Sequence, residues 1–392
     1  MTDAVIVSMG RTPFARAFSG GLAKATEFDL AKAVVGSVLA RSGLDAKEID
    51  NIMLGEVYQG GGCIARYAAL DLGLPPEIPG VAIGGFCASG MMALHHAVAA
   101  IRSGMHRCVV AGGVSSISQS KLVTPSFLET GIMEQECSPS HPGAGDVPAM
   151  DLVMTLGEGT AKRFNLSRDD VDEWSERAHR LAVAAIDRKI FDNETIPVQV
   201  GDTTATIDEL PHRGLDLEFF RSLDSFLGPG CTVTIGNQTA LTDGAAAMMV
   251  CDAAFAAAQD TPVLAEIIGW SCTATDPDAA TMAASVASRR ALEVAGVSLD
   301  DIDLFEVHDS YASIGVAFER MLEIDREKLN IYGGGLALGH PYAASGTRVA
   351  GTLINALQRK GGGYGLGAVI GAGGVATAIV LDVRAPNGPG GD

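Results

Sequence analysis

Two hydrophobic patterns alternate along the chain. Short apolar runs rich in β-branched residues, such as residues 4–8, are separated by longer stretches in which apolar positions recur every three or four residues. The short runs predict buried strands and the longer stretches predict amphipathic helices. We expect strands at 4–8, 51–57, 107–112, 263–269, 303–308 and 367–372, and helices at 29–42, 169–188 and 279–295, with further helices starting at 89 and 345. This alternation predicts an α/β fold with mostly parallel sheets and helices on both faces.

The predicted elements occur in two copies. Residues 43–57 (GLDAKEIDNIMLGEV) are similar to residues 296–310 (GVSLDDIDLFEVHDS). The tripeptide Ala-Ser-Gly at 88–90 recurs at 344–346, and Ala-Gly-Gly at 111–113 recurs at 372–374. Three matches in the same order and at a nearly constant offset indicate a duplicated domain, because the period is far longer than that of solenoid repeats.

A segment of about 120 residues lies between the copies and has no counterpart. We therefore divide the chain into an N-terminal half (1–117 and 241–258), an inserted cap (118–240) and a C-terminal half (259–392). A long insertion of this kind is often a binding lobe.

Composition narrows the classes of ligand. The net charge of −19 makes nucleic acid and anionic membrane surfaces improbable partners. A phosphate-bearing ligand would need a local basic patch or helix N-termini to hold it against this field. The seven cysteines are odd in number, scattered, and free of any Cys-x-x-Cys pair, which argues against a disulfide framework or a zinc site. With no signal peptide or membrane span predicted, we expect a cytoplasmic protein.

Cys87 is the first candidate for chemistry. It follows the apolar run 81–83 and precedes a predicted helix, where unpaired N–H groups and the helix dipole are expected to lower the pKa of a thiol. The same N–H groups can stabilise an oxyanion. The matching position in the second copy is Ala343, so packing alone does not demand a thiol.

Two histidines of the second copy have unusual settings. His340 lies in the glycine-rich run GGGLALGHPYAASG, and His308 ends the predicted strand LFEVHDS. Ligands in α/β folds collect at the carboxyl ends of strands, so both rings could converge on one site. The remaining histidines are interpreted as structural: His95, His96, His106, His141, His179 and His212.

Over nearly its whole length the chain resembles the thiolases. The resemblance rests on CASGMMAL (87–94), GNQTALTDGAAA (236–247), LFEVHDSYA (304–312), GGGLALGHPYAASG (333–346) and VIGAGG (369–374). It implies a duplicated, five-layered α/β core with an inserted cap, and an enzyme that transfers acyl groups from coenzyme A thioesters.

The resemblance also assigns roles to residues. Cys87 would accept the acyl group, and His340 would be its base and a donor of one oxyanion hole. The N–H groups of Cys87 and Gly371 would form a second hole, and His308, which replaces an Asn of many thiolases, would donate to a thioester oxygen. The coenzyme A contacts would be Thr239 and Asn237 for pantetheine, and Arg213 or Arg221 for phosphate or adenine.

No bound metal or redox cofactor is implied, only a coenzyme A thioester as substrate. Thiolases are homodimers or homotetramers, and relatives with His in place of Asn often work with a small zinc-bearing OB-fold protein.

One departure from the thiolase pattern bears on mechanism. Thiolases usually carry a second cysteine, the acid/base for the α-proton, where this chain has Val369, and Ser310 is too weak an acid to replace it. His308 or His340 could take over this proton transfer. The alternatives to a thiolase-like cleavage or formation of a 3-ketoacyl-CoA are a decarboxylative or atypical ketosynthase-like C–C bond synthase with a Cys-His-His site, or a catalytically impaired CoA-binding subunit.

Overall fold

The computed structural model describes residues 3–57, 62–120, 140, 142 and 152–385; His141 lies outside them. The strands are β1 (Ala4–Arg11), β2 (Ala15–Arg16), β3 (Asn51–Gly55), β4 (Gly80–Ile83), β5 (Cys108–Ser115), β6 (Val198–Val200), β7 (Thr203–Ala205), β8 (Thr242–Asp252), β9 (Ala265–Ala274), β10 (Leu304–Val307), β11 (Gly363–Ile370) and β12 (Val375–Val383). The helices are α1 (Glu27–Ser42), α2 (Ile64–Asp71), α3 (Ser89–Arg102), α5 (Gly159–Arg163), α6 (Arg168–Asp187), α7 (Leu217–Ser222), α8 (Ala253–Ala258), α9 (Ala280–Ala295), α10 (Ala312–Leu322), α11 (Gly334–Leu338) and α12 (Ser345–Lys360).

The main sheet is mixed. Its strands follow the order β10-β11-β12-β9-β1-β8-β5-β3-β4, with β2 beside β8. Among the described strands of this sheet the parallel pairs are β3–β4, β3–β5 and β10–β11, whereas β1, β8, β9 and β12 run antiparallel to each of their neighbours in this order. The expectation of mostly parallel sheets was wrong. Strand β12 follows β11 after a short turn, and so short a connection permits only antiparallel pairing.

The duplication is visible in the strand order. The series β3-β5-β8-β1 of the first half corresponds to β10-β11-β12-β9 of the second, and the two series join where β1 pairs with β9. Helices α3 and α12 are the matching central helices, and each contacts strands of both halves.

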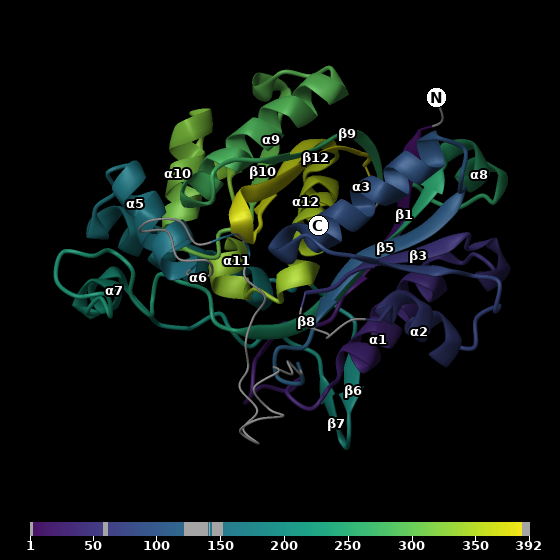
Figure 1. The fold of residues 1–392 in the computed structure, drawn as a ribbon, viewed down its shortest axis with the longest axis horizontal. Helices are drawn as coiled ribbons and strands as arrows, with labels where there is room; N and C mark the ends of the chain where they lie inside the picture. The colour runs from purple at the N-terminus through teal and green to yellow at the C-terminus, as the bar shows by residue number, and fades with distance from the viewer. Residues whose placement is uncertain (1–2, 58–61, 121–139, 141, 143–151, 386–392) are drawn as a thin grey trace.

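The elements form five layers, as Figure 1 shows. Helices α1 and α2 cover the outer face of the first half-sheet, and α9 with α10 cover the outer side of the second. Between the half-sheets lie α3 and α12, whose apolar side chains form one core with residues of both halves. Two further apolar clusters fill the outer interfaces. The five-layered α/β architecture predicted from the sequence is confirmed.

The inserted segment contributes α5, α6, α7 and the β6–β7 hairpin. Helix α6 begins at a capping box, in which Ser167 and Asp170 satisfy each other's backbone N–H groups. Its Trp174 is buried against Gly315 of α10 and donates from Nε1 to Asp309 (2.8 Å). The cap therefore anchors the loop that follows β10. Its sequence-derived boundaries stay a prediction.

No helix among the described residues is both long and apolar enough to span a membrane.

Candidate active site

Cys87 lies in a strained turn between β4 and α3. Phe86, immediately before it, has a φ of 51°, a left-handed conformation that is uncommon for a bulky residue. Gly85 permits the turn because a Cβ there would overlap the Met92 side chain. A 3-10 turn at residues 86–88 then leads into α3, and Cys87 is 5% exposed. Backbone strain of this type often marks functional sites.

The thiol meets a histidine from the other half of the chain. His340 Nε2 lies 3.1 Å from Cys87 Sγ, and His340 Nδ1 lies 2.6 Å from Ser345 Oγ. The backbone N–H of His340 donates to Thr242 Oγ1 (3.0 Å). Gly339, with a φ of 109°, allows the chain to turn here. The histidine is thus held from three sides against the sulfur.

Both members of this pair are neutral at neutral pH. Burial raises the pKa of the Cys87 thiol to about 12, and burial, assisted by the charge of Arg348, lowers the pKa of His340 to about 3. The sequence-based expectation of a lowered thiol pKa was therefore wrong. Hydrogen bonds to the sulfur lower its pKa, but desolvation outweighs them. The network assigns the thiol hydrogen to a bond with Nε2, and the Nδ1–H to Ser345.

The backbone donors near the thiol differ from those expected. The N–H of Gly371 donates to the Val375 carbonyl (2.7 Å), so it is already engaged. The amides that hydrogen-bond to the Cys87 sulfur are those of Cys87 itself and of Ala372. The Ala372 amide thus lies at the resting sulfur, and the oxyanion role of Gly371 stays a prediction.

His308 lies against His340, with ring centroids 4.1 Å apart. Its Nδ1 accepts from Arg348 Nη2 (3.3 Å), and Arg348 also pairs with Glu306. Because an arginine can only donate, the His308 proton resides on Nε2, which is buried and has no partner among the described residues. Burial, with the neighbouring His340 and Arg348, lowers the pKa of His308 well below its usual value. His308 is therefore a neutral N–H donor.

A cavity of about 690 Å³ opens beside Cys87 and His340. Its wall is mostly apolar and combines the core with the cap. Ser310 and Tyr311 line it, whereas Val369 is fully buried in the same central apolar core as Cys87. Among the described cysteines, Cys87 alone lines this cavity. No cluster of metal-ligating side chains was found among the described residues.

The residues predicted to contact coenzyme A do not all line the cavity. Thr239 lines the cavity and donates to the Gly335 carbonyl (3.0 Å). Asn237 is buried, and its amide donates to Asp172 and to the Thr232 carbonyl, so it shapes the loop that carries Thr239.

The two predicted arginines lie elsewhere. Arg213 and Arg221 make surface ion pairs with Asp187 and Asp169, and neither lines the cavity.

Sequence reasoning missed three basic side chains of the cavity wall: Arg16, His179 and His212. The two histidines had been interpreted as structural. Arg16 lies on β2, His179 on α6 and His212 in the segment before α7, and no local motif connects these regions. His95, His96 and His106 do not line the cavity.

Family models of the thiolases match almost the whole chain. The model described as "Thiolase, N-terminal domain" matches residues 4–254, and "Thiolase, C-terminal domain" matches residues 261–383. The chain belongs to the thiolase family. This confirms the resemblance drawn from the sequence motifs.

Several thiolase-family proteins are similar to the chain over their whole length. Acetyl-CoA acetyltransferases of Yarrowia lipolytica and Pseudomonas aeruginosa are each 34% identical, with 97% of this chain matched to 96% and 99% of theirs. The mitochondrial 3-ketoacyl-CoA thiolase of Bos taurus is 30% identical, over 96% of this chain and 97% of its own. The crystal structure of the Bacillus anthracis acetyl-CoA acetyltransferase superposes with a TM-score of 0.91 at 29% identity, covering 98% of this thiolase and 99% of that chain.

Proposed function

We propose that this thiolase works through an acyl-enzyme on Cys87 and cleaves or forms a 3-ketoacyl-CoA. Its class, an acyl-CoA C-acyltransferase, follows from both matched thiolase domains and from relatives named as acetyl-CoA acetyltransferases. The observation that carries the mechanism is the 3.1 Å contact between Cys87 Sγ and His340 Nε2 beside a cavity.

In the first step the thiol attacks the thioester carbonyl. The S–H proton passes to His340 Nε2 as the C–S bond forms, and the proton on Nδ1 stays with its Ser345 partner. The amides of Cys87 and Ala372 are suitable donors to the developing oxyanion. Collapse of this intermediate breaks the bond to coenzyme A, whose sulfur takes the proton from His340.

In the second step a carbon nucleophile or coenzyme A removes the acyl group from Cys87. His308 is suited to donate its Nε2–H to a thioester oxygen, but its remaining lone pair faces Arg348. A base role for His308 is therefore disfavoured, and among the two histidines considered for the α-proton we propose His340. Val369, at the position where the thiolase resemblance implies a second cysteine, is buried and has no ionisable group.

The alternatives named from the sequence are not favoured by these relatives. None of the relatives compared above is named as a decarboxylative synthase or as an inactive CoA-binding subunit.

For the assembly, we propose a homodimer or homotetramer with a coenzyme A thioester as substrate and no bound cofactor. A small zinc-bearing OB-fold protein is a candidate further partner. A cytoplasmic location is supported by a cytosolic mouse acetyl-CoA acetyltransferase that is 32% identical to this chain. Light scattering of the purified chain, alone and co-expressed with such a partner, tests the assembly.

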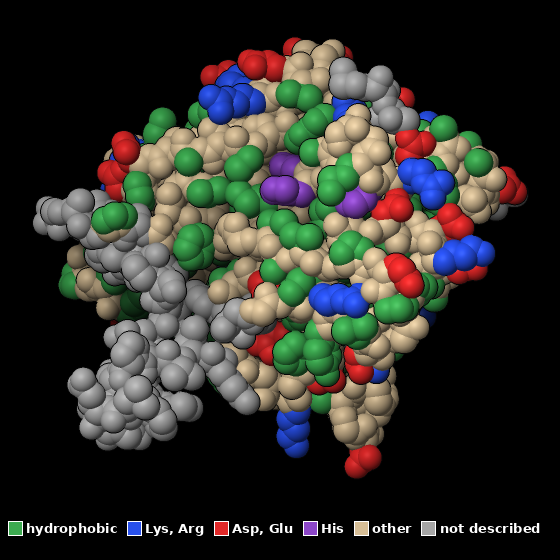
Figure 2. Space-filling model, turned by 45° about the vertical axis from the view of Figure 1, so that its right-hand side comes forward, with side chains coloured by type: hydrophobic (Ala, Val, Ile, Leu, Met, Phe, Trp, Pro, Cys, Tyr) green, Lys and Arg blue, Asp and Glu red, His purple; other side chains and the backbone are tan. Residues whose placement is uncertain are grey.

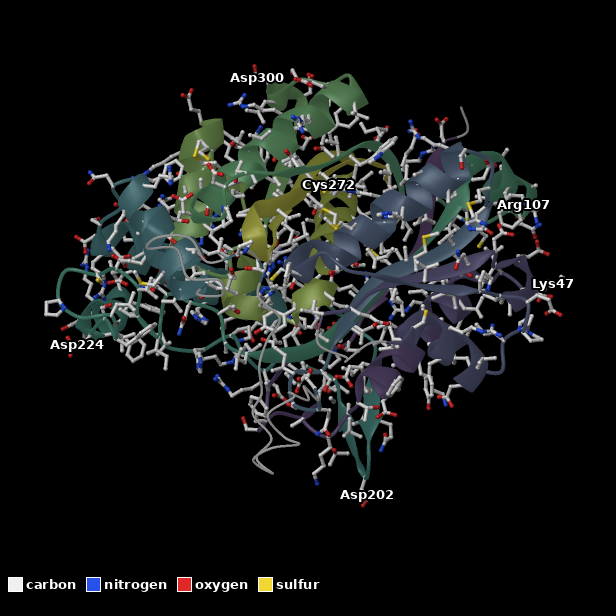
Figure 3. The ribbon with its side chains drawn as sticks, viewed as in Figure 1. Lys47, Arg107, Asp202, Asp224, Cys272 and Asp300 are labelled. Carbon is white, nitrogen blue, oxygen red and sulfur yellow. The ribbon has the colours of Figure 1, made fainter. Side chains whose placement is uncertain are left out.

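The catalytic proposal is tested by intact-mass spectrometry after incubation with acetyl-CoA and acetoacetyl-CoA. We expect one acetyl adduct on the wild-type chain and on Cys272→Ala. Cys272, labelled in Figure 3, lies on β9 and is not among the residues that line the cavity. Cys87→Ala should give no adduct and no thiolysis of acetoacetyl-CoA. A stable acetyl adduct on the Cys87→Ala protein would disprove the assignment.

A further inference from the structure

The cavity has an unusual balance of charge. Among the described residues that line it there is one arginine, Arg16, and no lysine, aspartate or glutamate. The whole chain carries a net charge of −19. Acidic side chains are mixed with basic ones over the face in Figure 2, and the labelled Asp202, Asp224 and Asp300 lie at the outer edge of the molecule in Figure 3. The cavity wall therefore differs from the molecular surface, because its one described arginine has no acidic side chain beside it in the wall.

Arg16 is close to the catalytic pair in the sheet. It pairs with Thr242 across β2 and β8, and Thr242 Oγ1 is the acceptor for the backbone N–H of His340. Glu209 accepts from the backbone N–H of Arg16 (3.3 Å) and of Gly21 (2.8 Å), whereas the guanidinium of Arg16 contacts His212. The position of Arg16 is thus fixed through its backbone, which leaves the charged end of its side chain to the cavity.

Several other arginines among the described residues have acidic partners. Arg11 pairs with Glu194 and Asp208, Arg348 with Glu306, and the surface residues Arg213 and Arg221 with aspartates. Among the described residues the guanidinium of Arg16 has one polar side-chain contact, Nη2 to His212 Nε2 at 3.3 Å. A partly buried cation that lacks a counter-ion is unfavourable unless a ligand supplies the negative charge.

Beside Arg16, His212 and His179 provide further hydrogen-bond donors. Because Arg16 donates to His212 Nε2, that ring is neutral, and burial together with the charge of Arg16 lowers its pKa. The backbone N–H of His212 donates to His179 Nδ1 (3.2 Å), which leaves the His179 proton on Nε2. Burial lowers the pKa of His179 to about 4, so this ring is a neutral donor. Both rings line the same cavity as Cys87.

We propose that Arg16, supported by His212 and His179, is an anion subsite that binds a carboxylate or phosphate group of the acyl-CoA substrate. This inference rests on the proposed function, since it assigns the subsite to the thioester that acylates Cys87. The planar guanidinium can bind either oxyanion with two parallel hydrogen bonds. The anion has two possible sources, an acidic end on the acyl chain or a phosphate of coenzyme A.

Four thioesters separate the two sources: succinyl and butyryl groups, each carried on coenzyme A or on pantetheine. Succinyl and butyryl have the same number of carbons and differ in a terminal carboxylate, whereas pantetheine lacks the phosphates of coenzyme A. Mass spectrometry follows the acylation of Cys87 and gives its second-order rate constant in the wild-type chain, in Arg16→Gln and in Arg16→Lys. Arg180→Gln is the matched control, because Arg180 forms a surface ion pair with Glu176 on α6 and does not line the cavity.

If the subsite binds an acyl carboxylate, Arg16→Gln slows both succinyl transfers about tenfold or more and leaves both butyryl transfers unchanged. If it binds a phosphate, the same substitution slows both coenzyme A thioesters and neither pantetheine thioester. Arg16→Lys should retain part of the rate in either case, because it keeps the charge and loses the planar geometry. Arg180→Gln should behave as the unmodified chain.

Equal rates for Arg16→Gln and Arg180→Gln with all four thioesters would overturn the subsite, as would a uniform loss with all four. Protection of Cys87 from iodoacetamide provides a measurement that needs no variant. Glutarate or pyrophosphate should protect the unmodified chain and uncharged pentane-1,5-diol should not; lack of protection by both anions would count against the subsite. If no thioester acylates Cys87, the proposed function itself fails, which is distinguishable from equal acylation by all four.

Discussion

The matching turns of the two halves have the same architecture and different chemistry. Residues 86–88 and 342–344 each form a 3-10 turn that leads into a central helix, α3 or α12. In the first turn Phe86 has a positive φ and is followed by Cys87, whereas Tyr342 lacks a positive φ and is followed by Ala343. The fold thus needs the turn in both halves, but the strained form occurs where the thiol must face the cavity.

The serines after these turns show the same division. Ser89 Oγ donates to the Phe86 carbonyl (2.6 Å) and so stabilises its own turn. Ser345, at the equivalent position, instead contacts His340 Nδ1. One half therefore supplies the nucleophile, and the other supplies the base and the group that orients it. A single unduplicated half has no complete site.

The largest expected effect comes from moving the thiol between halves. Cys87→Ala should lower the rate of acyl transfer at least about 10³-fold, because no other described cavity residue is a thiol. Adding Ala343→Cys to this variant should not restore the rate, since residue 343 is fully buried and its carbonyl lies against Gly90 and Gly113. Single-turnover assays with acetoacetyl-CoA measure both proteins. Recovery of activity in the double variant would mean that the two turns are chemically equivalent.

The paired serines give a smaller, asymmetric effect. Ser345→Ala removes the partner of His340 Nδ1, and we expect the acylation rate to fall about tenfold, since a buried hydrogen bond is worth about 1 kcal/mol or more. Ser89→Ala should lower the free energy of unfolding by a similar amount and change the acylation rate less. Rates and unfolding midpoints of the two variants provide the comparison. Equal rate losses would show that Ser345 acts only through folding.

The crossing of α3 and α12 is expected to be symmetric. A Cβ at Gly90 would overlap the Ala343 carbonyl, and one at Gly346 would lie 2.7 Å from the Met91 backbone nitrogen. Alanine at either position should lower the free energy of unfolding by about 1–3 kcal/mol. Gly36→Ala in α1 is the control, because its methyl would meet only the movable end of Leu72. A Gly90 variant as stable as the Gly36 control would contradict this close packing.

The sequence predicted the parts of the molecule that local patterns encode. The duplication, the central helices and the turns with Cys87 and His340 were read from repeats and glycine-rich runs. The strand directions were not, because an apolar run does not specify whether its neighbour is parallel. Arg16 and His212 were missed because they come together only when the cap folds over the core.

The backbone amide that contacts the thiol is that of Ala372 and not that of Gly371, and this difference has a related cause. Which amide points at the sulfur depends on backbone dihedral angles near Gly373, whose φ is 75°, and not on residue type alone. The protonation of the thiol likewise depends on burial by both halves, which the helix N-terminus pattern does not contain.

The smallest expected effect is an absence of pH dependence. Proton transfer from Cys87 requires a neutral His340, present above its pKa of about 3, and a protonated thiol, present below its pKa of about 12. The rate of acylation should therefore be flat between about pH 5 and 9, with no limb near the ordinary pKa values of histidine or cysteine. Single-turnover acylation across this range measures it, and Cys272→Ala serves as the control for other thiols. A pH-dependent change in rate near pH 6.5 that disappears in Ser345→Ala would contradict this prediction. It would show that substrate binding admits enough water to protonate His340, so that the neutral Cys87–His340 pair does not persist in the reacting complex.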